Sequence, residues 1–92
     1  MPEAPEHRIK RLKMRSMRRG IKEMDLILSA FADARLAALD EAGLTLYDHL
    51  LEENDHDLYQ WIAGQGAAPA RYEELIGQIR QQIDEAAAGR AI

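Results

Sequence analysis

The sequence has no cysteine, which excludes disulfides, thiolate metal sites and cysteine nucleophiles among its 92 residues. Besides the tyrosines, the hydroxyl nucleophiles are only Ser16, Ser29 and Thr45, and no Ser/His/Asp set stands out. There is no glycine-rich phosphate loop, no apolar run near the roughly 20 residues of a membrane span and no segment with the period-two alternation of a strand. We therefore expect a helical domain that is not an enzyme and does not insert into a membrane.

The first six residues carry two acids and no apolar stretch, unlike a secretory signal or a mitochondrial presequence. The lack of cysteine also suits a reducing compartment. Together these features predict a cytoplasmic protein, and we expect that it is bacterial.

Charge is divided unevenly along the chain. Residues 1–22 carry a net charge of +6 and residues 23–92 a net charge of −10, which add to the −4 of the whole chain. The basic stretch 7–22 is open to three interpretations: a solvated helix face, a nucleic-acid-binding or regulatory module, or a surface that docks onto an acidic protein. No aromatic residue lies among the cations before Phe31, which disfavours nucleic acid, and an acidic chain with one basic patch suits a specific protein partner better.

The spacing of apolar residues predicts an all-α protein, a compact bundle of four to five short helices. The expected helices cover about 7–18, 21–33, 45–53, 55–63 and 70–86, with 34–42 either continuing the second helix or forming a separate turn. The clearest apolar stripe is that of the last helix, with Tyr72, Leu75, Ile76, Ile79 and Ile83 on one face. We expect one domain over 7–86, with a disordered tail at 1–6 and a frayed tail at 87–92.

Capping residues give the expected helix ends. We expect Gly20 to end the first helix and Gly43 to end the Ala-rich segment. Thr45 with Asp48 is expected to cap the third helix, Asn54 or Asp55 to cap the fourth, and Gly64 and Gly66 to end it.

The segment Arg18-Arg19-Gly20-Ile21-Lys22-Glu23 joins the basic and acidic parts of the chain. It could be only a helix end followed by a first-turn glutamate. As a recognition surface, it would use Gly20 for close approach of a partner backbone, the planar fork of Arg19 for carboxylates or carbonyls, and Glu23 as an acceptor.

The acidic run 52–57 has a metal-binding alternative, because His49, Glu53 and His56 have the spacing of one helical face. We expect instead a capped turn whose acids face solvent or the basic first helix. Downstream, Trp61 is expected in the core, and Tyr59 is expected to be partly exposed and to contact a partner.

Two motifs together resemble the FAD assembly factors of succinate dehydrogenase, called assembly factor 2 in mitochondria. The first is Arg18-Arg19-Gly20-x-x-Glu23-Met24-Asp25-Leu26-Ile27-Leu28 with Phe31, and the second is Leu50-Leu51-Glu52 followed by Asp55-x-Asp57-Leu58-Tyr59-x-Trp61. The likeness covers about residues 8–64. The chain departs from the common pattern at Ile21-Lys22, where Met-Leu is common, and at His56, where Pro is common.

The resemblance implies a small helical bundle that binds the flavoprotein subunit of succinate dehydrogenase, and in some bacteria that of fumarate reductase, and assists covalent attachment of FAD to a histidine of that subunit. FAD is then the partner's cofactor, and we expect none held by this chain, which would be a monomer when free. The signatures fall on Arg19, Gly20 and Glu23, and on Asp55, Asp57, Leu58, Tyr59 and Trp61. The predicted partner-binding residues are Arg18, Arg19, Gly20, Glu23, Asp55, Asp57 and Tyr59.

Overall fold

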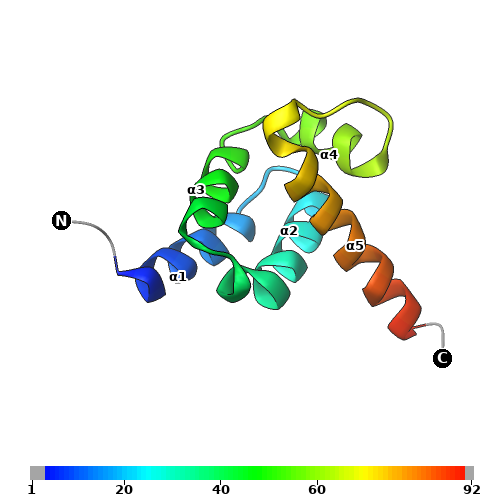
Figure 1. Cartoon of the computed structure of the whole chain (residues 1–92). Coiled ribbons are helices and arrows are strands. Elements are labelled where there is room, and N and C mark those ends of the chain that lie inside the picture. The colour runs from blue at the N-terminus through cyan, green and yellow to red at the C-terminus, as the bar shows by residue number, and fades with distance from the viewer. Residues whose placement is uncertain (1–3, 91–92) are drawn as a thin grey trace.

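A computed structural model of the chain describes residues 4–90 and is entirely helical apart from its connections (Figure 1). The helices are α1 (Pro5–Ser16), α2 (Lys22–Arg35), α3 (Glu41–Leu50), α4 (Asp55–Ala63) and α5 (Glu73–Arg90), with short 3-10 helices at Leu36–Ala38 and Ala70–Tyr72. No strand occurs within 4–90. The predicted all-α bundle is confirmed.

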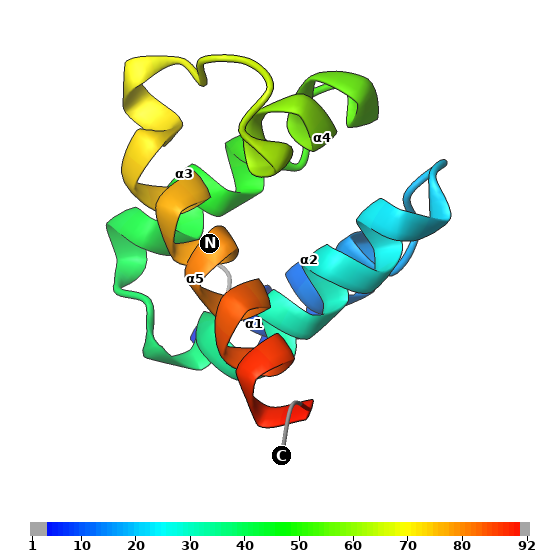
Figure 2. The ribbon, with the colours of Figure 1, turned by 90° about the vertical axis from the view of Figure 1, so that its right-hand side faces the viewer.

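Helix α2 lies in the middle of the bundle and contacts α1, α4 and α5. Figures 1 and 2 show α1 and the C-terminal half of α5 on opposite sides of the molecule, with α3 and α4 closing one end. In the described part of the chain, none of the helices is both long and apolar enough to cross a membrane.

Each helix contributes apolar side chains to one continuous core. The core comprises Leu12, Met24, Leu28, Phe31, Ala32, Leu36, Leu44, Tyr47, Leu50, Leu51, Leu58, Ile62, Tyr72, Leu75, Ile76 and Ile79. The predicted stripe of the last helix is therefore buried as far as Ile79, whereas Ile83 is 37% exposed because the end of α5 extends past the other helices. Trp61 packs against the core but is only half-buried.

One buried polar contact ties three helices together. The Ser16 and Tyr47 hydroxyls lie 2.6 Å apart in the core, and Ser16 Oγ also donates to the Leu12 carbonyl at 2.8 Å. Burial raises the pKa of Tyr47 to about 12, so the phenol stays protonated. The Tyr47 ring packs against Phe31 of α2, with ring centroids 5.6 Å apart.

The helical region is longer at both ends than expected. Helix α1 begins at Pro5, because proline suits the first position of a helix, so Pro5 and Glu6 are helical rather than part of a tail. Helix α5 likewise continues to Arg90, beyond the expected end at 86. The remaining tail residues, 1–3 and 91–92, lie outside the described part of the chain.

The predicted caps at Gly43 and Thr45 are wrong. Asp40 caps α3 by accepting the Gly43 N–H at 2.7 Å, which places Gly43 and Thr45 inside the first turns of the helix. The sequence signal was present, since an aspartate precedes the helix by one residue. The predicted boundaries of α4 are confirmed, because Asn54 accepts the His56 N–H at 2.8 Å and Gly64 ends the helix in the left-handed conformation with φ 79°.

Candidate functional site

Helices α1 and α3 are joined by a ladder of arginines that matches a ladder of oxygen acceptors. Arg8 donates to Thr45 Oγ1 at 2.6 Å, Arg11 to Asp48 at 3.2 Å, and Arg15 to Asp48 and, at 2.7 Å, to Glu52. The arginines repeat every three or four residues along one face of α1, and their acceptors are Thr45 and Asp48 of α3 and Glu52 in the turn that follows it. These three arginines, which made the N-terminal segment look like a binding surface, are thus used within the fold, and Lys13 also lies 3.9 Å from Asp33 of α2.

Asp48 lies at the centre of this ladder. Its partial burial alone would raise the pKa of the carboxyl group, but the hydrogen bonds from Arg11 and Arg15 outweigh burial and lower the pKa below its ordinary value. The carboxylate therefore stays charged down to acidic pH, and the link between α1 and α3 remains intact there.

The next arginine, Arg19, closes the junction between α3 and α4. Its Nε donates to Asp55 Oδ1 at 2.7 Å, one terminal nitrogen lies 2.6 Å from the same oxygen and donates to the Glu53 carbonyl at 2.9 Å, and the other donates to the Leu51 carbonyl. The second Asp55 oxygen accepts the Gly20 N–H at 3.0 Å. We call this set, Arg19, Gly20, Leu51, Glu53 and Asp55, the junction lock.

The charges of the junction lock are favourable at the helix ends where they lie. Leu51 caps the C-terminus of α3, where carbonyl groups lack helical partners and attract a cation, and Asp55 lies in the first turn of α4, where a carboxylate is favoured. The Arg19 and Asp55 side chains are only 12% and 15% exposed, and the Arg19 amide also donates to Asp25 of α2. The lock thus fixes the loop between α1 and α2 against α4.

This geometry changes the role that we predicted for Arg19. Its guanidinium already has partners inside the domain and does not present a free fork to a partner protein. Arg19 and Asp55 instead position the residues around them. The sequence could not reveal this, because Arg19 and Asp55 are 36 residues apart and their pairing depends on how α3 places α4.

Gly20 does not have the helix-ending role that we expected. Helix α1 ends at Ser16, and the only glycine with positive φ in the described chain is Gly64. A Cβ at Gly20 would lie 3.5 Å from Asp55 Oδ2, an ordinary contact, so neither backbone conformation nor internal packing requires glycine here. Gly20 is exposed, which leaves close approach by another molecule as a reason for its small size.

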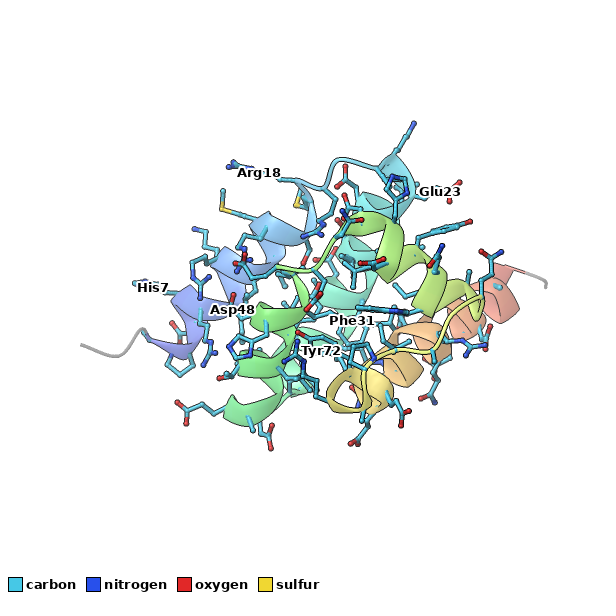
Figure 3. The ribbon with its side chains drawn as sticks, turned by 90° about the horizontal axis from the view of Figure 1, so that it is seen from above. His7, Arg18, Glu23, Phe31, Asp48 and Tyr72 are labelled. Atoms are coloured by element: carbon cyan, nitrogen blue, oxygen red, sulfur yellow. The ribbon has the colours of Figure 1, made fainter. Side chains whose placement is uncertain are left out.

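Four of the predicted site residues point outward around the junction lock. Arg18 and Glu23 lie along one edge of the molecule in Figure 3, and Asp57 and Tyr59 are exposed on α4. Tyr59 is 37% exposed and hydrogen-bonds Glu23, whose carboxylate raises the pKa of the phenol. We call Arg18, Gly20, Glu23, Asp57 and Tyr59 the outer patch. It combines side chains of α2 and α4 with the loop between α1 and α2.

The metal-binding alternative is wrong for the described residues. Within 4–90, no three histidine or acidic side chains come together as a metal site. His49 and His56 are exposed on different helices, and Glu53 instead accepts hydrogen bonds from Tyr72 at 3.1 Å and from Arg71 at 3.4 Å. The expectation that the acidic run forms a capped turn is confirmed by the Asn54 cap. Of its acids, Glu52 pairs with Arg15 of α1 and Asp57 is exposed to solvent.

Comparison with known proteins agrees with the two motifs. The model of the Sdh5 family, described as flavinator of succinate dehydrogenase, matches residues 10–83. The chain belongs to this family. It is 39% identical over 77 residues to succinate dehydrogenase assembly factor 2 of Drosophila grimshawi, covering 82% of this chain and 52% of that protein. It is also 36% identical over 89 residues to assembly factor 2-B of Drosophila mojavensis, covering 92% of this chain and 57% of that protein.

The relatives differ from this chain in length, and their names give a cellular location. The chain spans little more than half the length of the Drosophila relatives and 29% of a Mycosarcoma maydis relative, to which it is 41% identical over 70 residues. All three are named as mitochondrial proteins of eukaryotes, which contradicts our prediction of a bacterial cytoplasmic location.

Proposed function

We propose that this chain is an assembly factor that binds the flavoprotein subunit of succinate dehydrogenase through the outer patch and promotes covalent attachment of FAD to that subunit. The observation that carries the proposal is the junction lock. It brings the segment 18–23 and the segment 55–59, the two family motifs, onto one exposed surface.

The proposed role is that of a chaperone, and FAD belongs to the partner. The flavin supplies the chemistry of the covalent bond, and the histidine of the flavoprotein receives it. A bound factor accelerates such a step by favouring the arrangement of the partner in which the two groups meet, which requires tighter binding to that arrangement than to others. In this chain Gly20 allows close approach, while Glu23 and Tyr59 supply an acceptor and an amphipathic ring.

The flavoprotein of fumarate reductase is a second proposed client, and the free factor is proposed to be a monomer.

The test is co-production of the factor with the flavoprotein subunit, followed by in-gel flavin fluorescence of the denatured subunit. Gly20→Arg should abolish covalent flavin while leaving the circular dichroism spectrum unchanged. Gly20→Leu should do the same, and it excludes the possibility that a new arginine merely competes with Arg19 for Asp55. The matched control is Gly77→Arg on α5, where a side chain would meet nothing within 4 Å.

Normal flavin content with both Gly20 variants would show that the outer patch is not the binding surface. Loss of flavin with Gly77→Arg as well would show that the effect is not specific to the patch. Loss of the helical spectrum with the Gly20 variants would assign a structural role to Gly20, contrary to the contact distances around it.

A further inference from the structure

The outward face of α1 carries positive charge and apolar surface that the bundle does not use. Leu12 and Ser16 face the core, whereas Met14 and Met17 are 44% and 62% exposed. Lys10 and Arg18 are exposed beside the two methionines, and neither takes part in the arginine ladder.

Lys10, Met14 and Arg18 border a shallow hollow along the helix. Its volume is about 330 Å³, and it is lined by His7, Lys10, Arg11, Met14, Arg15 and Arg18. Figure 3 shows His7 and Arg18 at the two ends of this face, with Arg18 on the same edge as Glu23. The hollow is therefore continuous with the outer patch, through Arg18.

We infer that the outward face of α1 is a second docking surface, for an acidic segment of the flavoprotein partner that carries an apolar side chain. The inference rests on the proposed function. The apolar side chain would cover Met14, whose flexible thioether adapts to varied shapes, and carboxylates would pair with Lys10 and Arg18. Docking of one helix face onto a partner of opposite charge is a recurrent mode of protein recognition.

Charge and composition favour a protein over a lipid or nucleic-acid surface. Helices that lie in a membrane interface present tryptophan, phenylalanine or leucine, and this face presents only two methionines. Residues 23–92 carry a net charge of −10, which would be repelled by an anionic bilayer or by nucleic acid. A protein partner can place its acids only opposite α1 and so avoid this repulsion.

Because the chain has no cysteine, a single introduced thiol can map the contact. Met14→Cys, Lys22→Cys and Ala67→Cys are each labelled with a photoreactive benzophenone maleimide and mixed with the purified flavoprotein subunit. Met14→Cys should cross-link to an acidic segment of the subunit, Lys22→Cys should cross-link beside the outer patch, and Ala67→Cys, in the exposed loop after α4, should not cross-link.

Cross-linking from Lys22→Cys alone would overturn the second docking surface and leave the proposed function standing. Absence of cross-links from both positions would overturn both. A Met14→Cys product on a segment without acids would contradict the predicted chemistry of the partner.

A pair of double variants measures the contribution of this face. Lys10→Gln with Met14→Gln removes one cation and one exposed apolar side chain, and it should weaken binding to the subunit about tenfold. The matched control, Arg80→Gln with Ile83→Gln, removes the same two kinds of group from α5 and should change affinity less than about twofold. Equal affinities of the two double variants would overturn the inference. A lipid-binding result would overturn it as well. In that case the parent would cosediment with vesicles of phosphatidylcholine and phosphatidylglycerol, the α1 double variant would not, and both would bind the subunit with the same affinity.

Discussion

The Ser16 and Tyr47 hydroxyls form a 2.6 Å hydrogen bond in a core that is otherwise apolar. Ser16 contributes its backbone to α1 and Tyr47 contributes its ring to the packing of α3 on α2. The bond therefore fixes the position of α1, whose remaining attachment to α3 depends on long, half-exposed arginines.

Tyr47→Phe removes the hydrogen bond to Ser16 and a long 3.5 Å contact with the Leu28 carbonyl, while Ser16 keeps its bond to Leu12. It should lower the free energy of unfolding by about 1 kcal/mol, the usual net value of one buried hydrogen bond. Tyr59→Phe removes an equivalent hydroxyl from the surface and should cost less than about 0.5 kcal/mol. Urea unfolding followed by circular dichroism measures both. Equal costs would mean that the buried pair does not contribute to stability.

Arg19→Lys tests the junction lock. Lysine keeps the charge but not the planar fork, so it cannot serve Asp55 and the two carbonyls at once, and we expect a loss of about 1–2 kcal/mol. Arg18→Lys, at the exposed neighbouring position, should be neutral in stability. If Arg19→Lys unfolds at the same urea concentration as the parent, the lock does not hold the loop in place.

The lowered pKa of Asp48 predicts a dependence on pH. Because the carboxyl pKa is lower in the folded state, the contribution of Asp48 is fully present above the unfolded pKa of about 4 and is lost as pH falls through the folded pKa. Asp48→Asn should therefore be less stable than the parent by about 1 kcal/mol at pH 7, with the difference shrinking below about pH 4. Thermal melts across this range measure it, and a difference that grows toward acid would contradict the sign.

Ile79→Asp should unfold the domain, since an unpaired carboxylate at a fully buried position of α5 costs several kcal/mol. Ile83→Asp, one turn further along the same stripe, should be tolerated with a loss below about 1 kcal/mol because Ile83 is 37% exposed. Similar melting temperatures for the two variants would show that α5 is not buried as far as Ile79.

Local signals predicted most of the fold. The apolar spacing located the core of α5, and Asn54 and Gly64 bounded α4, because both features depend on neighbouring residues alone. The start of α3 was misplaced when a threonine inside the helix was preferred to Asp40 as the cap.

The two motifs predicted which residues gather at the candidate site, but not which of them face outward and which are used inside the fold. Gly20, Glu23 and Tyr59 lie on the surface as a recognition role requires, and their contact with a partner stays a prediction. Arg19 turned inward because its partner, Asp55, lies in a helix whose placement depends on the whole bundle. The arginine ladder was not predicted, although the sequence contains its two rows of matching period, at 8, 11 and 15 and at 45, 48 and 52.

The outer patch is assembled from segments that meet only after folding, which has a thermodynamic consequence. A peptide spanning residues 16–28 contains Gly20 and Glu23 but lacks the helix that carries Asp55 and Tyr59, so it should not compete with the domain for a partner. Recognition and folding are then linked equilibria: the partner binds the native chain and not the unfolded one. A saturating partner therefore raises the melting temperature of this small domain by mass action, even though the patch contributes little to the core.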